Sequence, residues 1–155
     1  MSVIFDKEVD MVLFICHGNV ARSQFAEALM IEKGYCDVFS AGTNVKPGKE
    51  GVALADDGAT ARNAVKYFFE ITGIDISREK RKRISRNFIE KADVIVSMVN
   101  ENILPYYVLN CRDKLICWEV EDPHDMDLEG YKDIISQIDR NVNQLYDRLR
   151  STGKN

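Results

Sequence analysis

The sequence of 155 residues lacks a long hydrophobic run, a surplus of positive charge and any repeat or low-complexity segment. A membrane-spanning helix needs about 20 consecutive apolar residues, and no stretch approaches that length. The net charge of −4 gives no reason to expect the basic surface of a general nucleic-acid-binding protein. These absences predict a protein with no membrane span and no nucleic-acid partner.

Residues that bind metals are also scarce. Only two histidines accompany the four cysteines, which include no C-x-x-C pair: Cys16, Cys36, Cys111 and Cys117. Structural zinc sites use closely spaced pairs of such residues, so no metal site is expected. Residues 1–10 are too charged, and too poor in apolar residues, for a signal peptide. We therefore expect a cytoplasmic protein, and in that reducing compartment most of its cysteines stay thiols.

The length and composition fit one globular domain. With 45% hydrophobic and 30% charged residues, a chain of this size can bury a core without disulfides or metal. We expect a single domain over residues 1–155, in which residues 1–10 form an N-terminal extension. The oligomeric state stays open.

The most informative stretch is residues 11–23, MVLFICHGNVARS. Its first five residues form an unbroken apolar run, typical of a central parallel strand that is buried on both faces. Between Cys16 and Arg22 lie five residues, enough to curl a loop whose backbone N–H groups converge on one point: His17, Gly18, Asn19, Val20 and Ala21. Such a loop at the N-terminus of a helix predicts an anion site.

The two ends of this loop carry the candidate chemistry. The helix dipole and the amide donors favour the thiolate form of Cys16, which is the nucleophilic form. Arg22 keeps its charge and presents a planar fork that can hold two oxygens of a tetrahedral oxyanion. A single cysteine is more commonly a small buried hydrophobe at the end of a strand. The spacing Cys-x5-Arg-Ser behind an apolar strand nevertheless favours a nucleophile.

The rest of the chain alternates strands with helices. The apolar periodicity predicts helices over residues 23–33, 60–72 and 128–150, and a shorter one within residues 100–112, broken near Pro105. Short apolar runs predict strands over residues 37–41, 92–98 and 114–120, the last with Cys117 in the core. The composition of residues 42–58 is that of a loop. This alternation predicts a doubly wound parallel sheet.

One dense basic run covers residues 78–86. Long charged side chains are normally exposed, so a solvated surface is the simpler interpretation. The functional alternative is a positive flank that steers an anionic substrate toward the loop.

Residues 11–23 resemble the active-site loop of the low-molecular-weight protein tyrosine phosphatases, a family that shares its fold with thioredoxin-coupled arsenate reductases. The likeness continues through residues 40–43 (SAGT), 73–77 (GIDIS), 92–98 (ADVIVSM) and 122–123 (DP). The resemblance implies an α/β fold of the phosphotyrosine phosphatase I-like type. Such a fold is a single three-layer domain with a four-stranded parallel sheet flanked by helices.

Asp122 is the candidate acid. It follows the expected fourth strand, and ligand sites in such sheets lie beyond the carboxyl ends of the strands, where Cys16 also lies. The resemblance implies that Cys16 attacks phosphorus while Arg22 and the loop amides hold the phosphoryl oxygens, with no metal or cofactor. Asp122 then protonates the leaving group and later activates the water that hydrolyses the phosphocysteine.

By the same resemblance, the loop residues bind the phosphoryl group of the substrate: His17, Gly18, Asn19, Val20, Ala21 and Ser23. Ser23 would hydrogen-bond the thiolate, and Asn19 and Ser40 would brace the loop. The expected enzyme is a phosphomonoester hydrolase, specifically a protein tyrosine phosphatase, that acts on phosphotyrosine proteins or small phosphate esters. Inorganic phosphate or another oxyanion is expected to bind in the loop.

Two other functions remain open. An arsenate reductase would use the same loop but needs resolving thiols. Residues 98–110 contain no cysteine, although thioredoxin-coupled reductases carry their first resolving thiol there, so Cys111 and Cys117 are the possible substitutes. A non-catalytic oxyanion-binding module would need neither the thiolate nor the acid. We therefore favour the phosphatase.

Overall fold

The computed structural model describes residues 9–35 and 37–151. Its sheet has four parallel strands in the order β2-β1-β3-β4, namely β1 (Val12–Cys16), β2 (Val38–Gly42), β3 (Val94–Ser97) and β4 (Leu115–Cys117). The central strands β1 and β3 are buried along their whole length, which explains their unbroken apolar sequences. Cys16 is paired with Gly42, and Ser97 with Cys117. The carboxyl ends of the strands therefore lie together, at one end of the sheet.

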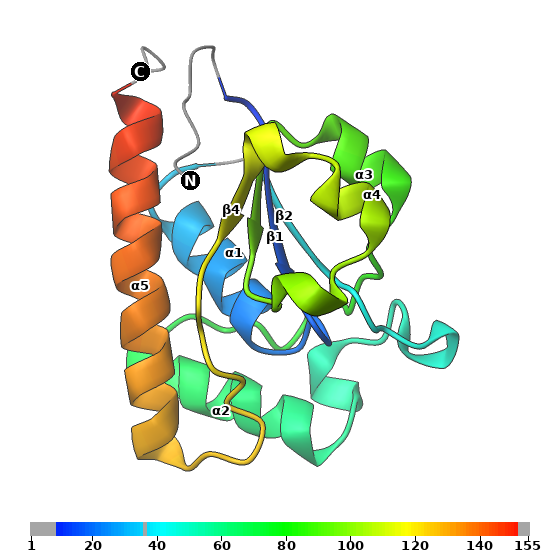
Figure 1. Cartoon of the computed structure of the whole chain (residues 1–155). Helices are drawn as coiled ribbons and strands as arrows, with labels where there is room; N and C mark the ends of the chain where they lie inside the picture. Colours follow the sequence, from blue (N-terminus) through cyan, green and yellow to red (C-terminus); the bar gives the residue numbers. More distant parts are fainter. Residues whose placement is uncertain (1–8, 36, 152–155) are drawn as a thin grey trace.

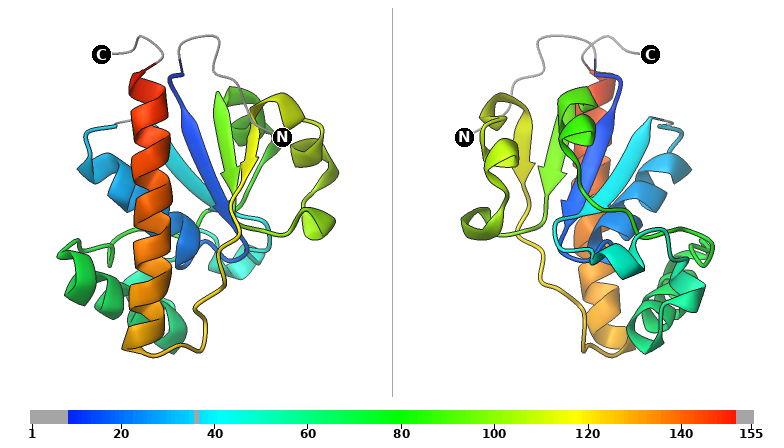
Figure 2. Two further views of the ribbon diagram at one scale, coloured as in Figure 1. Left: turned by 60° about the vertical axis from the view of Figure 1, so that its left-hand side comes forward. Right: turned by 90° about the vertical axis from the view of Figure 1, so that its right-hand side faces the viewer.

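Helices cover both faces of this sheet (Figures 1 and 2). One face carries α1 (Arg22–Glu32) and α5 (Leu128–Arg150), and the other carries α3 (Arg86–Lys91) and α4 (Tyr106–Leu109). The remaining helix, α2 (Ala59–Thr72), lies past the carboxyl ends of the strands, against α5. The expected three-layer α/β fold with a four-stranded parallel sheet is confirmed.

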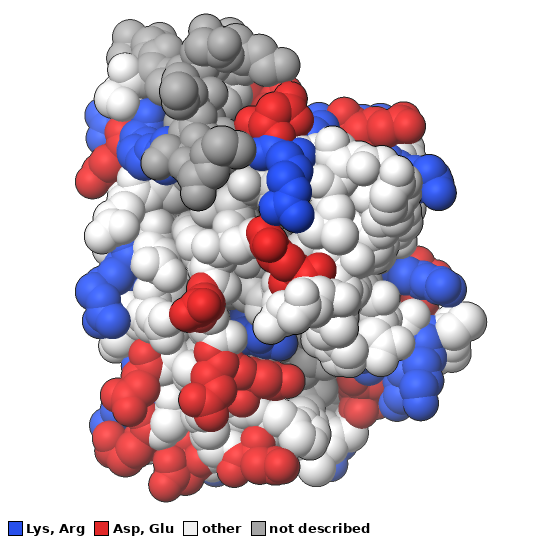
Figure 3. Space-filling view, in the orientation of Figure 1, with Lys and Arg blue, Asp and Glu red and all other residues white. Residues whose placement is uncertain are grey.

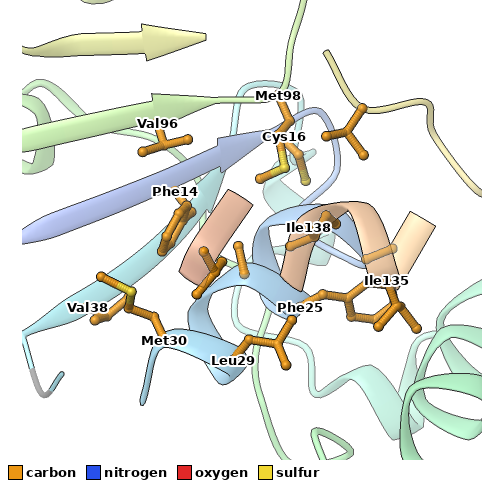
Figure 4. Close-up of a cluster of buried hydrophobic side chains, with 14 of the residues drawn as sticks. Phe14, Cys16, Phe25, Leu29, Met30, Val38, Val96, Met98, Ile135 and Ile138 are labelled. Atoms are coloured by element: carbon orange, nitrogen blue, oxygen red, sulfur yellow. The ribbon is translucent and has the colours of Figure 1, made fainter. Parts of the chain in front are cut away.

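The larger part of the core lies between the sheet, α1 and α5. Figure 4 shows Phe14 and Val96 of the sheet on the same side as Phe25 of α1 and Ile138 of α5. The ring of Phe25 stacks on that of Phe68 in α2, with centroids 4.5 Å apart. Burying side chains of this size stabilises the fold by about 1.5–3 kcal/mol each. This packing fixes the start of α1, and with it the loop that follows β1.

Several predicted boundaries shift, and one burial prediction is wrong. The structure has α5 at the predicted bounds, whereas β4 ends at Cys117, three residues before the predicted end at Val120. Because β4 is an edge strand, Cys117 is exposed and not in the core. The helix α3 was not predicted; the Ser85 hydroxyl caps it by accepting a hydrogen bond from the Phe88 N–H.

Two other predicted features have a mixed outcome. The loop over residues 42–58 contains two short 3-10 turns, Pro47–Lys49 and Leu54–Asp56. Most of the predicted N-terminal extension, residues 1–8, lies outside the described residues, as does Cys36, while Val9 is 3% exposed and belongs to the core. Among the helices described, none is both long enough and apolar enough to cross a membrane.

Candidate active site

Cys16 is the last residue of β1, and its side chain is buried. The cysteine loop, residues 16–23, leaves the strand there and enters α1 at Arg22. Asn19 adopts a left-handed backbone conformation, with φ 53°, which turns the chain within the loop. Across residues 9–35 and 37–151, the backbone N–H groups of residues 18–22 find no protein acceptor, and no side chain caps α1. The loop therefore offers free amides at a helix N-terminus, where an oxyanion can bind.

The extension of β2 holds the cysteine loop from outside. The Thr43 N–H donates to the Cys16 carbonyl at 3.0 Å, and the Asn44 N–H donates to the His17 carbonyl at 2.9 Å. At Gly42, a Cβ atom would lie 2.7 Å from the His17 carbonyl oxygen and 2.9 Å from the Asn19 nitrogen. Only glycine lets β2 approach the loop backbone this closely, which gives the SAGT segment a structural reason.

A buried hydrogen-bond network supports the loop from within. Asn19 Nδ2 donates to Ser23 Oγ at 2.8 Å and to Ser40 Oγ at 3.0 Å. Ser23 Oγ lies 2.9 Å from Cys16 Sγ. Because Ser23 already accepts from Asn19, its hydroxyl hydrogen can point at the sulfur. A hydroxyl donor at this distance stabilises a thiolate.

The middle of the basic run forms part of this support. The Lys82 N–H donates to Asn19 Oδ1 at 2.8 Å, Arg81 Nε donates to the Gly18 carbonyl at 3.0 Å, and Gln24 Nε2 donates to the Lys80 carbonyl at 3.1 Å. The solvated-surface interpretation is therefore wrong for Arg81, whose side chain is 13% exposed, and holds only in part for Lys82, whose side chain is 28% exposed. It holds for the four exposed basic side chains, which are those of Arg78, Lys80, Arg83 and Arg86.

A buried carboxylate completes the network. Ser40 Oγ donates to Glu27 Oε1 at 2.6 Å, and Lys82 Nζ lies 3.8 Å from the same oxygen. Burial raises the pKa of Glu27 above its ordinary value, and the Lys82 ammonium and the Ser40 hydroxyl offset part of that rise. The sequence alone gave no sign of this group, because Glu27 falls on the helix between apolar positions.

Arg22 is held at its back by two carbonyl groups. Its Nη1 donates to the Met98 oxygen at 2.7 Å and to the Val120 oxygen at 2.9 Å. These carbonyls follow β3 and β4, so the sheet itself aims the guanidinium. Among the residues described, none hydrogen-bonds to the Nη2 and Nε edge of Arg22, so this side of the planar fork is suited to bind an oxyanion.

Asp122 faces Arg22 from the segment between β4 and α5. Its Oδ2 lies 3.8 Å from Arg22 Nη2, and its Oδ1 accepts from the His124 N–H at 3.1 Å. The side chain is 56% exposed, so solvent screens this ion pair and leaves the carboxylate free to reorient. Cys16, Arg22 and Asp122 line one cavity of about 370 Å³, so the structure brings the three predicted catalytic residues together.

The other predicted site residues divide into two groups. His17, Gly18, Val20 and Ala21 line the cavity, whereas Asn19 and Ser23 are fully buried behind it. The cavity also has lining residues that the sequence did not indicate: Lys49, Asp57, His124 and Tyr131. Arg81 lines it too, from the basic run for which a positive flank was the functional alternative. Tyr131 of α5 is 1% exposed and packs on Phe25, and it also reaches the cavity. Burial, with the nearby Asp122 carboxylate, raises its pKa to about 12.

Cys111 and Cys117 lie away from the cavity. Cys111 is half-buried, and Cys117 is an exposed residue near Glu101. Partial burial of the sulfur, together with the Glu101 carboxylate, raises the pKa of the Cys117 thiol. Within the part of the chain that the structure describes, no three His, Cys, Asp or Glu residues form a group that could hold a metal ion.

Known proteins match this fold and loop. The family model for low molecular weight phosphotyrosine protein phosphatase matches residues 11–155. An arsenate reductase of Halalkalibacterium halodurans is 33% identical over 117 residues, which make up 73% of each protein. A protein-arginine-phosphatase of Bacillus subtilis is 25% identical over 150 residues, covering 90% of this chain and 96% of the relative.

A solved structure extends the match to three dimensions. The crystal structure of a low molecular weight protein tyrosine phosphatase from T. tengcongensis has a TM-score of 0.69 and 27% identity, and the match covers 88% of this chain and 97% of that one. The family match includes the strand, the cysteine loop and the segment that carries Asp122. The chain therefore belongs to the low molecular weight phosphotyrosine protein phosphatase family.

Proposed function

We propose that this chain is a phosphomonoester hydrolase that works through a phosphocysteine on Cys16, with phosphotyrosine proteins or aryl phosphates as substrates. One observation carries the proposal: a buried sulfur lies at the start of a loop whose free backbone N–H groups and Arg22 can surround a phosphoryl group. Donors fixed in advance around developing charge are a large source of catalysis.

In the first step, the Cys16 thiolate attacks phosphorus, the S–P bond forms and the bond from phosphorus to the leaving oxygen breaks. The loop amides and Arg22 hold the other three oxygens. Asp122 gives its proton to the leaving oxygen, for which its exposed position near Arg22 is suited.

In the second step, Asp122 is a carboxylate and takes a proton from water, which attacks phosphorus and displaces the sulfur. The Ser23 hydroxyl, 2.9 Å from Cys16 Sγ, stabilises the thiolate as it leaves. Inorganic phosphate is then released from the loop.

Release of phosphate from p-nitrophenyl phosphate, without added metal, tests the proposal. Wild type should turn over, Cys16→Ser should be inactive, and Asp122→Ala should be slowed by about 10²–10⁴-fold because it lacks the general base that activates water in the second step. Wild-type protein that releases no phosphate, or Cys16→Ser protein that remains active, would contradict the proposal.

Arsenate reduction is the second candidate, favoured by the 33% identity to a protein named arsenate reductase. Cys117 is aligned with Ser97, and Ser97 with Ile15, so Cys117 lies two strands away from the residue before Cys16. Two strand spacings are roughly 10 Å, whereas a disulfide needs Cα atoms within about 7 Å. A relay through Cys117 would need backbone movement, so the described geometry supports the phosphatase better.

A further inference from the structure

One wall of the cavity carries charged side chains that the phosphoryl-transfer steps do not use. Lys49 and Asp57 come from the loop after β2, and Arg81 comes from the basic run. Asp57 Oδ2 lies 2.9 Å from Arg81 Nη1, and Asp57 Oδ1 lies 3.0 Å from Lys49 Nζ. The Asp57 side chain is 5% exposed. Two cations thus share one buried carboxylate, and the cluster keeps a net positive charge.

The guanidinium of Arg81 is held in place beside the cysteine loop. Its Nε donates to the Gly18 carbonyl at 3.0 Å and its Nη1 to Asp57, and the side chain is 13% exposed. Its Nη2 makes no hydrogen bond to any of the residues described, and it would lie 3.4 Å from a Cβ atom on Gly18. A guanidinium that is already fixed, with one free edge, loses little conformational entropy when it binds an anion.

The opposite wall has the opposite charge. The loop with Lys49 and Asp57 follows β2, and Asp122 follows β4, at the other edge of the sheet. Figure 3 shows acidic side chains gathered over the start of α5 and the segment before it. The exposed carboxylates there are Glu119, Glu121, Asp122, Asp125, Asp127 and Glu129. An anionic group on a ligand is repelled on this side and attracted on the Arg81 side.

We propose that Arg81, held by Asp57 and assisted by Lys49, determines substrate specificity by binding a second anionic group of the substrate. That group is a carboxylate or a phosphate on the protein segment next to the residue whose phosphoryl group occupies the cysteine loop. The inference rests on the proposed function and narrows its substrates to phosphorylated segments with an acidic or phosphorylated neighbour. Arg81 is the fixed cation of this wall, because its hydrogen bond to the Gly18 carbonyl ties it to the cysteine loop.

Binding to the Cys16→Ser protein tests this without relying on turnover. Fluorescent phosphotyrosine peptides that differ only next to the phosphotyrosine, with Glu, Gln, Lys or a second phosphotyrosine, are titrated by anisotropy. The Glu peptide and the doubly phosphorylated peptide should bind about 3–10-fold more tightly than the Gln peptide. The Lys peptide should bind more weakly than all three. Tighter binding of the doubly phosphorylated peptide than of the Glu peptide would identify phosphate as the preferred group.

Variants assign the preference to this wall. Arg81→Gln and Lys49→Ala, each made in the Cys16→Ser protein, should reduce the ratio of Glu-peptide to Gln-peptide affinity toward one. Lys91→Ala is the matched control. Lys91 is exposed at the end of α3, just before β3 begins, and so lies at the end of the sheet opposite the cavity; the affinity ratio of this variant should stay at the starting value. Each ratio is taken within one protein, so a general disturbance of the cysteine loop cancels.

Equal affinities for the Glu and Gln peptides, no binding of any peptide, or a ratio unchanged in both Arg81→Gln and Lys49→Ala would overturn the inference. A failure of the proposed function shows elsewhere, as absent hydrolysis of p-nitrophenyl phosphate by the wild-type protein.

Discussion

The side-chain amide of Asn19 is central to the buried hydrogen-bond network that supports the cysteine loop, so its removal should lower the stability of the fold strongly. Four hydrogen bonds involve it: Nδ2 donates to Ser23 and Ser40, and Oδ1 accepts from Lys82 N and Gln24 Nε2. Each such bond contributes about 1 kcal/mol net. An Asn19→Ala variant should therefore lose about 4 kcal/mol of unfolding free energy, a large share of the roughly 5–15 kcal/mol of a typical domain.

The backbone at Asn19 allows a second, independent check. A residue with a Cβ is strained at φ 53°, by about 1–2 kcal/mol, whereas glycine is not. Glycine also makes the unfolded chain more flexible, which removes about 0.5–1 kcal/mol of that advantage. Asn19→Gly should therefore be more stable than Asn19→Ala, by up to about 1.5 kcal/mol. Urea unfolding followed by circular dichroism measures both; an Asn19→Ala loss below about 1 kcal/mol, or a glycine variant less stable than alanine, would refute the reasoning.

Three further predictions concern other parts of the site. Arg22→Lys cannot present a fork to the phosphoryl group, so kcat/KM for p-nitrophenyl phosphate should fall by about 10²–10³-fold; a fall below tenfold would contradict the role of its geometry. Folding raises the pKa of Glu27 above its ordinary value of 4.5, so the folded protein loses stability as pH rises above 4.5 and the carboxyl ionises. Glu27→Gln does not ionise there, so its unfolding free energy in urea should increase relative to that of wild type between acid and neutral pH. A difference between the two proteins that does not change with pH would contradict this prediction. Gly42→Ala should destabilise the fold by about 1–3 kcal/mol, because the added Cβ would clash with the cysteine loop. Gly48→Ala is the control and should leave the stability unchanged, since a Cβ there meets nothing within 4 Å. Similar melting temperatures for the two variants would disprove the close approach of β2 to the loop.

The sequence was most informative where a local pattern has one structural meaning. The stripe of apolar residues on α5 predicted that helix at its observed bounds. The apolar run before Cys16 predicted a strand buried on both faces, and β1 is buried throughout. The Cys-x5-Arg-Ser spacing was informative for the same reason, because the strand, the loop and the helix that it predicts are consecutive in the chain.

Features that depend on distant segments could not be predicted. The exposure of Cys117 follows from the place of β4 at the edge of the sheet, and nothing near residue 117 encodes the strand order. The basic run resembles a solvated surface until the fold places Arg81 against Gly18 and Asp57. Asp57 lies in a segment of loop composition, and only the folded chain buries its carboxylate.

The central claim is that catalysis passes through a phosphorylated Cys16. The most direct measurement is to mix the Asp122→Ala protein with p-nitrophenyl phosphate, quench within milliseconds and analyse the peptides by mass spectrometry. Because p-nitrophenolate can leave without receiving a proton, the loss of Asp122 slows the attack of water more than it slows the first step. The intermediate should therefore accumulate, and one phosphoryl group should be found on the peptide that contains Cys16. Turnover of the substrate without any phosphate on Cys16, or with the phosphate on another residue, would contradict the account.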